Sequence, residues 1–600
     1  MKKFTIFFMI MMISALAIAQ SKYSSTKVQT APLKSLKEQV MPAQQMNPVT
    51  SSKAALEEVI GNTVYDMQTN SSVDTRIRVY NDGTIGAAWI RGTSDNNERG
   101  TGYNYYDGTD WGLPPTSRIE NERTGWPSYS QLGQNGEIVI AHLDNGLKIS
   151  TRTTKGTGPW SYTTILGPAG ATDISWPRIM TNGPDHDYIH MMVWTYTAYQ
   201  NLDLALLYYR SLDGGTTWDK KDVILPQLTS ADYDGFNGDE VAWGTPHGDT
   251  IYFAVSGPWI DTFIMLSTDN GENWTKIPIL SNANKKLPTG TTYVPPFRMS
   301  DGSVAVELDH KGIFHVAFGI GGGYMEGSTK YIYINSNGLV YWNSTMPMVP
   351  DSLDLDTLEA HGMLLGAVYN GPDPDDTITA APSYRVGLSS MPQVSIDDYD
   401  NIYFTWSAVK PGDPSPDKYN YRHIYGRAWF HDKPEMGEMI DFNDGIMYLF
   451  YEFVYPAMAK QIKNDKLAIL YQSADTPGSN IVNTAIPVHD NTIEFREIPG
   501  SDFWPVGIGP DKTAGQNQVL QNYPNPAGDY TRIPVSLAAG CDVTLTLTTV
   551  TGMKIRELQM GTMSPGNHVL TVRTNGLPSG IYFYTVSMGT EKVTRKMIIQ

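Results

Sequence analysis

The stretch that decides the fold is RIRVYNDGTIGAAWI, residues 76–90. It contains a short apolar strand, the polar turn N-D-G-T and a second strand that includes Trp89. Asn, Asp and Gly favour tight turns, whereas β-branched and aromatic residues favour strands. The stretch therefore predicts a β-hairpin.

The same hairpin pattern returns six more times along the chain. Successive copies start 50 to 88 residues apart, which suits one four-stranded sheet per repeat. We expect an all-β fold in which residues 56–500 form a β-propeller of seven blades, with six as the alternative count. The last copy lacks a clear fourth strand, and residues 59–67 are expected to supply it. The six further copies begin at Pro127, Pro177, Val241, Val304, Pro392 and Pro456.

Two turns inside the repeats share the pattern S-x-D-x-G-x-x-W, in SLDGGTTW and STDNGENW. The Asp can accept backbone N–H bonds, the Gly can take positive φ, and the Trp can cover the hairpin with apolar surface. The pattern resembles the Asp-box, or BNR repeat, of sialidase-like propellers, and this resemblance implies a structural role away from the binding face. Its residues are Ser211, Asp213, Gly215, Trp218, Ser267, Asp269, Gly271 and Trp274.

The N-terminus has the order of a cleavable export signal. Two lysines precede an apolar run, and small residues lead to a predicted cut after Ala19. Residues 20–55, rich in Ser, Lys, Gln and Pro, predict a flexible leader. No later segment approaches the roughly 20 apolar residues that a membrane helix needs. We therefore expect a mature protein that is soluble or held at the cell surface.

The C-terminus predicts a separate small domain. Residues 501–518 indicate a linker, and alternating strands over residues 519–600 indicate an Ig-like β-sandwich. Its motifs NYPNP, the turn at Gly552, LPSGIYF and a basic last strand resemble the type A sorting domain of the type IX secretion system of Bacteroidetes. That resemblance implies a translocon and a sortase as partners, attachment to lipopolysaccharide, and a location outside the outer membrane. The motif residues are Tyr523, Pro524, Asn525, Pro526, Gly552, Gly580, Lys592 and Lys596.

Composition limits the partners of the chain. A formal net charge of -18 argues against nucleic acid as a ligand, because such partners need a basic surface. The single cysteine, Cys541, excludes an intrachain disulfide. No cofactor is expected except Ca²⁺, for which the loop 232–240 offers Asp232, Asp234 and Asp239 without the full spacing of a known calcium loop. A solvated acidic loop is the favoured interpretation of this segment.

The sequence contains candidates for glycan chemistry. Sialidases hold a substrate carboxylate with several arginines, and four arginines lie near repeat starts here: Arg78, Arg178, Arg298 and Arg385. The favoured interpretation is that these arginines bond neighbouring blades or face solvent. The F-R-I-P element of that family is not matched in its usual place, since Phe297, Arg298 and Met299 follow both clear Asp-boxes.

The functional prediction is accordingly a secreted or surface propeller that binds glycan or protein, and a binding protein is expected rather than an enzyme. A sialidase-like glycoside hydrolase and a structural protein of the cell envelope are the alternatives.

Overall fold

The computed structural model describes residues 57–503 and 517–599, with gaps at 74, 94–97, 328, 334–335, 369–377, 379, 383, 413–414, 416–418, 446, 523–524 and 529, and two short strands at 26–29 and 49–50. The predicted export signal, most of the leader, residues 504–516 of the linker, Tyr523 and Pro524 lie outside the described residues. The described chain divides into two compact units, the larger including Ala55–Ile440 and Tyr451–Trp504 and the smaller including Pro505–Gln600.

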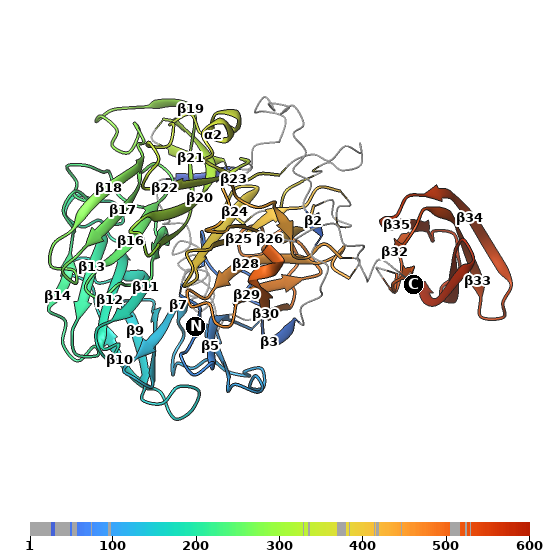
Figure 1. The fold of residues 1–600 in the computed structure, drawn as a ribbon, viewed down its shortest axis with the longest axis horizontal. Coiled ribbons are helices and arrows are strands. Elements are labelled where there is room, and N and C mark those ends of the chain that lie inside the picture. The colour runs from blue at the N-terminus through green and yellow to red at the C-terminus, as the bar shows by residue number, and fades with distance from the viewer. Residues whose placement is uncertain are drawn as a thin grey trace, which may run out of the picture. The chain divides into compact units, whose positions relative to one another are not determined.

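Strands make up almost all of the regular structure (Figure 1). Among the described residues, the helices are α2 (Leu355–Ala360) and the 3-10 turn η1 (Gly500–Phe503). The all-β prediction is therefore confirmed.

The larger unit contains seven sheets within its described residues, and they follow one another in chain order. In each of the first four sheets, successive strands pair antiparallel, as short turns require. Sheet 1 is β4 (Ile77–Val79), β5 (Ile85–Arg91) and β6 (Gly100–Tyr106); sheet 2 is β7 (Gly125–Leu132), β8 (Gly136–His142), β9 (Leu147–Arg152) and β10 (Ser161–Ile165); sheet 3 is β11 (Ile174–Asn182), β12 (Tyr188–Thr195), β13 (Leu206–Ser211) and β14 (Lys220–Val223); sheet 4 is β15 (Val241–Trp243), β16 (Ile251–Ser256), β17 (Thr262–Ser267) and β18 (Thr275–Leu280).

The last three sheets depart from this plan, sheets 5 and 6 by added strands and sheet 7 by a fourth strand, β3, that comes from the N-terminal side. In sheet 5 an extra strand, β21, pairs with the far end of β20, and β1 pairs in parallel with β21. Sheet 5 is β19 (Tyr293–Leu308), β20 (Phe314–Glu326), β22 (Leu339–Asn343) and β23 (Leu364–Gly366), with β21 (Thr329–Tyr333) and β1 (Thr26–Gln29); sheet 6 includes β24 (Ser389–Ile396), β25 (Ile402–Val409) and β26 (Arg422–Trp429); sheet 7 is β28 (Glu452–Met458), β29 (Lys466–Ala474), β30 (Asn491–Pro499) and β3 (Glu58–Thr63); two further short strands are β2 (Val49–Thr50) and β27 (Ile440–Asp441).

The two ends of the larger unit meet in sheet 7. Strand β3 pairs antiparallel with β30, placing Asn62 opposite Thr492. The prediction that residues 59–67 supply the missing fourth strand is confirmed for the part that forms β3. Neighbouring sheets contact one another through their first strands, and β29 of sheet 7 contacts β4 of sheet 1. The succession of contacts therefore closes into a ring, and the colours of Figure 1 pass around it from β5 through β16 to β29.

One backbone feature marks the same position in each of these seven sheets. A residue with φ between 48° and 104° stands near the beginning of the first strand in six sheets and, in sheet 5, at Gly302 within the long strand β19. Such values are unusual for bulky side chains. In five sheets the strand pairing shifts register around this residue, as at a β-bulge. In four a proline follows, so these repeat copies begin with Pro. The residues are Thr75, Trp126, Trp176, Asp239, Gly302, Met391 and Tyr455.

The smaller unit consists of two sheets that share one hydrophobic cluster. Val535 and Leu570 of one sheet pack with Leu545 and Tyr584 of the other, so the two sheets bury their inward faces together. The Ig-like topology stays a prediction. The sheets are β31 (Gln518–Val519), β32 (Tyr530–Leu537) and β35 (Gly566–Arg573), and β34 (Lys554–Met563), β33 (Cys541–Thr549), β36 (Gly580–Met588) and β37 (Glu591–Ile599).

Candidate functional site

Two groups of polar residues lie at opposite ends of the first strands of the ring. One gathers where these strands begin, around the segment 65–73 that leads from β3 to β4. The other gathers where several first strands end, at the turns that lead into the second strands. Loops at the ends of sheets are where binding residues concentrate in rigid β-scaffolds, so both ends are candidate sites.

The segment 65–73 crosses the first of these ends and bonds to distant sheets. Gln68 Nε2 donates to the Ile90 carbonyl of sheet 1 at 3.0 Å and to Gln472 Oε1 of sheet 7 at 3.1 Å. The carbonyl of Val73 accepts a bond from Gln393 Nε2 of sheet 6 at 2.7 Å. These bonds hold the segment in place between several sheets, and nearly all of its residues are buried.

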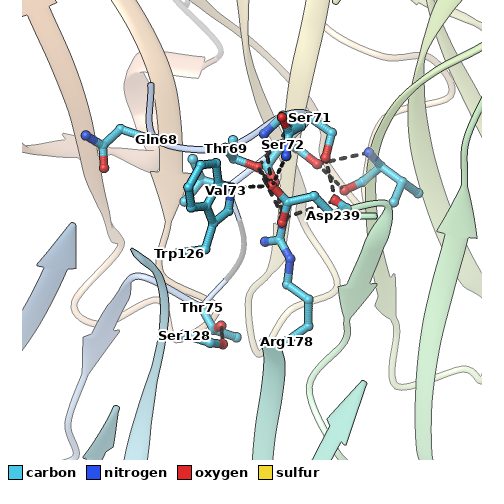
Figure 2. A network of polar contacts seen from close by, with 12 residues as sticks. Gln68, Thr69, Ser71, Ser72, Val73, Thr75, Trp126, Ser128, Arg178 and Asp239 are labelled. Carbon is cyan, nitrogen blue, oxygen red and sulfur yellow. Dashed lines mark hydrogen bonds and ion pairs between the residues drawn. The ribbon is translucent and has the colours of Figure 1, made fainter. Parts of the chain in front are cut away.

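Asp239 is the centre of the contacts beneath this segment (Figure 2). Its Oδ1 lies 2.6 Å from Arg178 Nη2, and both side chains are buried. Its Oδ2 accepts bonds from Thr69 Oγ1 at 2.6 Å and from Trp126 Nε1 at 2.9 Å. Arg178 Nη2 also donates to the carbonyl of Ser72 at 3.1 Å. Arginine and carboxylate thus satisfy one another inside the protein, which leaves neither directed at a ligand.

The four predicted arginines do not meet in a common pocket among the described residues. Arg385 Nη1 lies 3.4 Å from Asn70 Oδ1, so Arg178 and Arg385 both approach the segment 65–73. Arg298 Nη1, on β19 of sheet 5, donates to the carbonyl of Leu353 at 2.6 Å. Arg78 lies over the Tyr80 ring at 5.8 Å, and no ion pair joins it to the described carboxylates. Two of the four therefore lie near each other and two lie elsewhere.

The predicted calcium ligands also have separate partners. Asp232 accepts a hydrogen bond from Thr229 Oγ1 at 3.1 Å, and Asp234 Oδ2 lies 3.3 Å from Lys330 Nζ. Asp239 forms an ion pair with Arg178. Within the described residues, no three His, Cys, Asp or Glu side chains are grouped to hold a metal ion. The Ca²⁺ site stays a prediction without a supporting arrangement.

Next to Asp239, Glu240 is buried completely. Its Oε1 accepts the backbone N–H of Asn237 at 3.0 Å, and its Oε2 accepts Asn237 Nδ2 at 3.1 Å. Burial raises the pKa of Glu240 to about 8, with the neighbouring Asp239 adding a smaller upward effect. This carboxyl holds its proton at neutral pH.

The opposite end of the ring is open and forms a pocket of about 390 Å³. The turns of sheets 1, 4, 5, 6 and 7 line it, through residues 79–81, 245–247, 307–310, 396–398 and 460–463. Binding pockets for small ligands commonly measure about 300–1,000 Å³, so the space suits one small group such as a sugar unit.

An ion pair between sheets 5 and 7 forms part of the pocket wall. Lys460 Nζ lies 2.9 Å from Glu307 Oε1. Glu307 Oε2 accepts the backbone N–H of Thr245 at 3.1 Å and the Tyr252 hydroxyl at 3.2 Å. These hydrogen bonds fix the position of Glu307, and Glu307 in turn orients Lys460 through the ion pair.

The two S-x-D-x-G-x-x-W turns connect the third and fourth strands of sheets 3 and 4. Asp213 Oδ1 accepts the backbone N–H of Thr217 at 2.8 Å, and Asp269 Oδ1 accepts that of Asn273 at 2.8 Å. The expectation that these aspartates bond backbone N–H groups is confirmed. The backbone and side-chain N–H groups of Asn273 lower the pKa of Asp269 to about 2. Asp213 and Asp269 therefore stabilise the turns in which they lie.

In the smaller unit, the predicted motif residues occupy structural positions. Asn525 Oδ1 accepts the backbone N–H of Ile598 at 2.8 Å, and Pro526 follows it. Gly552 has a φ of 80° at the turn between β33 and β34, where a side chain would be strained. Gly580 begins β36, and Lys592 and Lys596 are exposed on β37. The motifs therefore form the ends and one face of this unit.

The segment 65–73 and the pairing of Arg178 with Asp239 were missed at the level of sequence. A signal for the segment exists, because DMQTNSSV, residues 66–73, is a polar run directly before the first repeat. The pocket had no such signal, since its lining comes from five separate turns.

Comparison with known proteins identifies the smaller unit. Residues 521–600 match the family model described as secretion system C-terminal sorting domain. A domain of this family marks the chain for export by the type IX secretion system, and the protein is secreted or attached to the cell surface. The sorting domain accordingly interacts with the secretion machinery. Among the described residues no helix is long and apolar enough to cross a membrane.

Solved structures similar to the chain include a polysaccharide lyase, an arabinofuranosidase and a sialidase. The polysaccharide lyase is Uly1, with 11% identity over 71% of this chain and 90% of that chain and a TM-score of 0.38. The α-L-arabinofuranosidase Arb93A from Fusarium graminearum has 12% identity, coverages of 63% and 98%, and a TM-score of 0.34. Trypanosoma rangeli sialidase has 12% identity, coverages of 91% and 89%, and a TM-score of 0.33. A search of curated proteins finds no match. At these TM-scores, function has to be argued from this chain's own residues.

Proposed function

We propose that this protein is an exported β-propeller of seven blades that binds an extracellular glycan at the open end of its ring. The seven sheets would be the blades, since each has a positive-φ residue in or just before its first strand and the sheets contact one another in a closed order. The sorting domain would be read by the translocon and then removed by a sortase that attaches the protein to lipopolysaccharide.

The observation that carries the binding proposal is the pocket of about 390 Å³ where five turns converge. Its lining mixes apolar side chains such as Leu308 and Ile462 with polar ones such as Asn81 and Gln461. Sugars present apolar C–H faces and polar hydroxyl edges, so a mixed lining of this kind complements them.

The alternative of a sialidase-like hydrolase has weaker support. A sialidase needs arginines that face the substrate and a tyrosine that is readily deprotonated. Arg178 is committed to Asp239. Tyr384, which lies near Glu452 and Arg422, is buried, and burial together with the Glu452 carboxylate holds its pKa well above the usual range. These features favour binding over hydrolysis.

The test is a glycan array probed with the full-length exported protein, together with a fluorogenic glycoside panel that includes sialosides. We expect binding without hydrolysis. Asn81→Trp, which fills the rim of the pocket, should abolish the binding. Asn145→Trp is the matched control, because Asn145 is an exposed residue in the turn between β8 and β9.

Each other outcome points to a different function. Hydrolysis that Arg298→Ala abolishes would favour the hydrolase. Binding of a protein but of no glycan would move the proposal to a protein ligand. Absence of glycan binding, of hydrolysis and of protein binding would favour a structural role in the cell envelope.

A further inference from the structure

The charged side chains of the pocket are mostly committed to partners within the protein. Lys460 pairs with Glu307 at 2.9 Å, and Lys463 Nζ donates to the backbone carbonyl of Asn81. His310 Nδ1 lies 2.9 Å from Asp400 Oδ1. Both lysines that line the pocket are therefore already engaged, and a ligand anion would have to compete with the protein for them.

Four other side chains that line the pocket have no partner of this kind among the described residues. The amides of Asn81 and Gln461, the imidazole of His247 and the carboxylate of Asp398 make no side-chain hydrogen bond or ion pair with the described residues. Asn81, His247 and Asp398 are exposed, and Gln461 is half-buried. Amides donate and accept, a carboxylate accepts, and an imidazole does either according to its tautomer. Together they offer both kinds of hydrogen bond that hydroxyl groups make.

The same set opposes a negatively charged ligand. The one charged group among these four is the acidic Asp398, and Asp397 stands beside it in the lining. A sugar carboxylate here would lose its water without gaining an uncommitted cation, and it would meet a like charge. Leu308, Ile396 and Ile462 supply apolar surface for the C–H face of a ring.

We propose that the pocket selects neutral, hydroxyl-rich sugar units and excludes carboxylated ones, an inference that rests on the glycan binding proposed above. Asp398 provides the exclusion through its charge. Gln461 and Asn81 bind the sugar hydroxyls through their amides.

Calorimetric titration of the full-length exported protein tests this selectivity. The probes are two oligosaccharides that differ only in the terminal unit, one ending in galactose or N-acetylglucosamine and one ending in glucuronate or sialate. We expect the acidic probe to bind about tenfold more weakly or worse, a difference of about 1.4 kcal/mol. Asp398→Lys should raise affinity for the acidic probe about tenfold, and Gln461→Ala should lower affinity for the neutral probe several-fold.

Asp490→Lys is the matched control, because Asp490 is exposed and does not line the pocket. It makes the same change in net charge as Asp398→Lys and should leave both affinities unchanged. Equal or tighter binding of the acidic probe by the unmodified protein would overturn the selectivity. Neutral binding that neither Asp398→Lys nor Gln461→Ala alters would overturn the assignment to this pocket while leaving glycan binding standing. Absence of binding to every glycan would overturn the proposed function itself.

Discussion

Arg178 and Asp239 form an ion pair between sheets 3 and 4, with Nη2 2.6 Å from Oδ1 and side chains only 4% and 2% exposed. Removing one partner of a buried pair leaves a charge without compensation, which costs about 3–5 kcal/mol. We therefore expect Asp239→Asn to lower the stability of the larger unit by about this amount. Asparagine suits the site, since Asp239 has a φ of 69° and Asn tolerates this region better than most residues.

Tryptophan fluorescence during denaturant unfolding measures this change selectively. All 14 tryptophans precede residue 505, so the signal reports the larger unit and not the sorting domain. Arg178→Met combined with Asp239→Asn should recover part of the loss, because no unpaired guanidinium remains. The control is Asp432→Asn, which breaks an exposed pair with Lys433 and should leave the stability nearly unchanged, because solvent screens exposed pairs. A loss for Asp239→Asn no larger than that of the control would contradict the prediction.

Ring closure depends on close packing between β3 and sheet 1. A Cβ added to Gly61 would lie 2.1 Å from Cζ2 of the buried Trp89. Gly61→Ala must therefore displace either the indole ring or β3, and overpacking of this kind costs about 1–3 kcal/mol. We expect a lower unfolding midpoint by tryptophan fluorescence. Glu58→Ala on the same strand has an exposed side chain and should leave the midpoint nearly unchanged; equal midpoints for the two variants would refute the role of this contact.

Local patterns in the sequence were sufficient for much of the fold. Turn residues between strand-forming runs, as in residues 76–90, predict hairpins because their effect acts over a few residues. The turn of Ser211 to Trp218 likewise contains its own donors and acceptors. Even the joining of β3 to sheet 7 follows from local reasoning, since the seventh repeat lacked a strand and a strand-like segment preceded the first.

The candidate site depends instead on how distant segments meet. Arg178 and Asp239 are 61 residues apart, and nothing near either residue indicates the other. The acidic neighbours of Asp239 in the sequence therefore suggest only a solvated acidic loop or a calcium loop. Asn81, Asp398 and Gln461 line one pocket only because the ring brings three turns together. Such a site can be found only after the ring is built.

We expect export to depend on a folded sorting domain. Leu545 is fully buried in the cluster that joins its two sheets, so Leu545→Asp should unfold this domain by burying an unpaired charge. We expect the variant to remain inside the cell, as a chain lacking residues 517–600 should. Immunoblots of cell, surface and medium fractions measure the distribution. Asp542→Asn is a control on the exposed face of the same strand, and its export should match that of the unmodified chain. Normal export of both Leu545→Asp and the truncated chain would contradict the dependence.

Glu240 should make the larger unit less stable as the pH rises through neutrality. An unfolded glutamate loses its proton near pH 4.3, whereas burial raises the pKa of Glu240 to about 8 in the folded protein. Between these values the folded state binds a proton that the unfolded state has released, so stability falls with increasing pH. Below pH 4.3 the contribution is fully present, and above pH 8 it is lost. The total change is on the order of a few kcal/mol.

Glu240→Gln isolates this contribution because glutamine keeps the shape of the side chain and cannot ionise. The denaturant midpoint, followed by tryptophan fluorescence from pH 5 to pH 9, should fall less steeply in the variant than in the unmodified protein. Glu452, whose pKa burial raises to about 7, acts in the same direction in both proteins and cancels in the comparison. Glu438→Gln, at an exposed site, should follow the unmodified curve. Parallel curves for Glu240→Gln and the unmodified protein would show that Glu240 does not hold its proton in the fold.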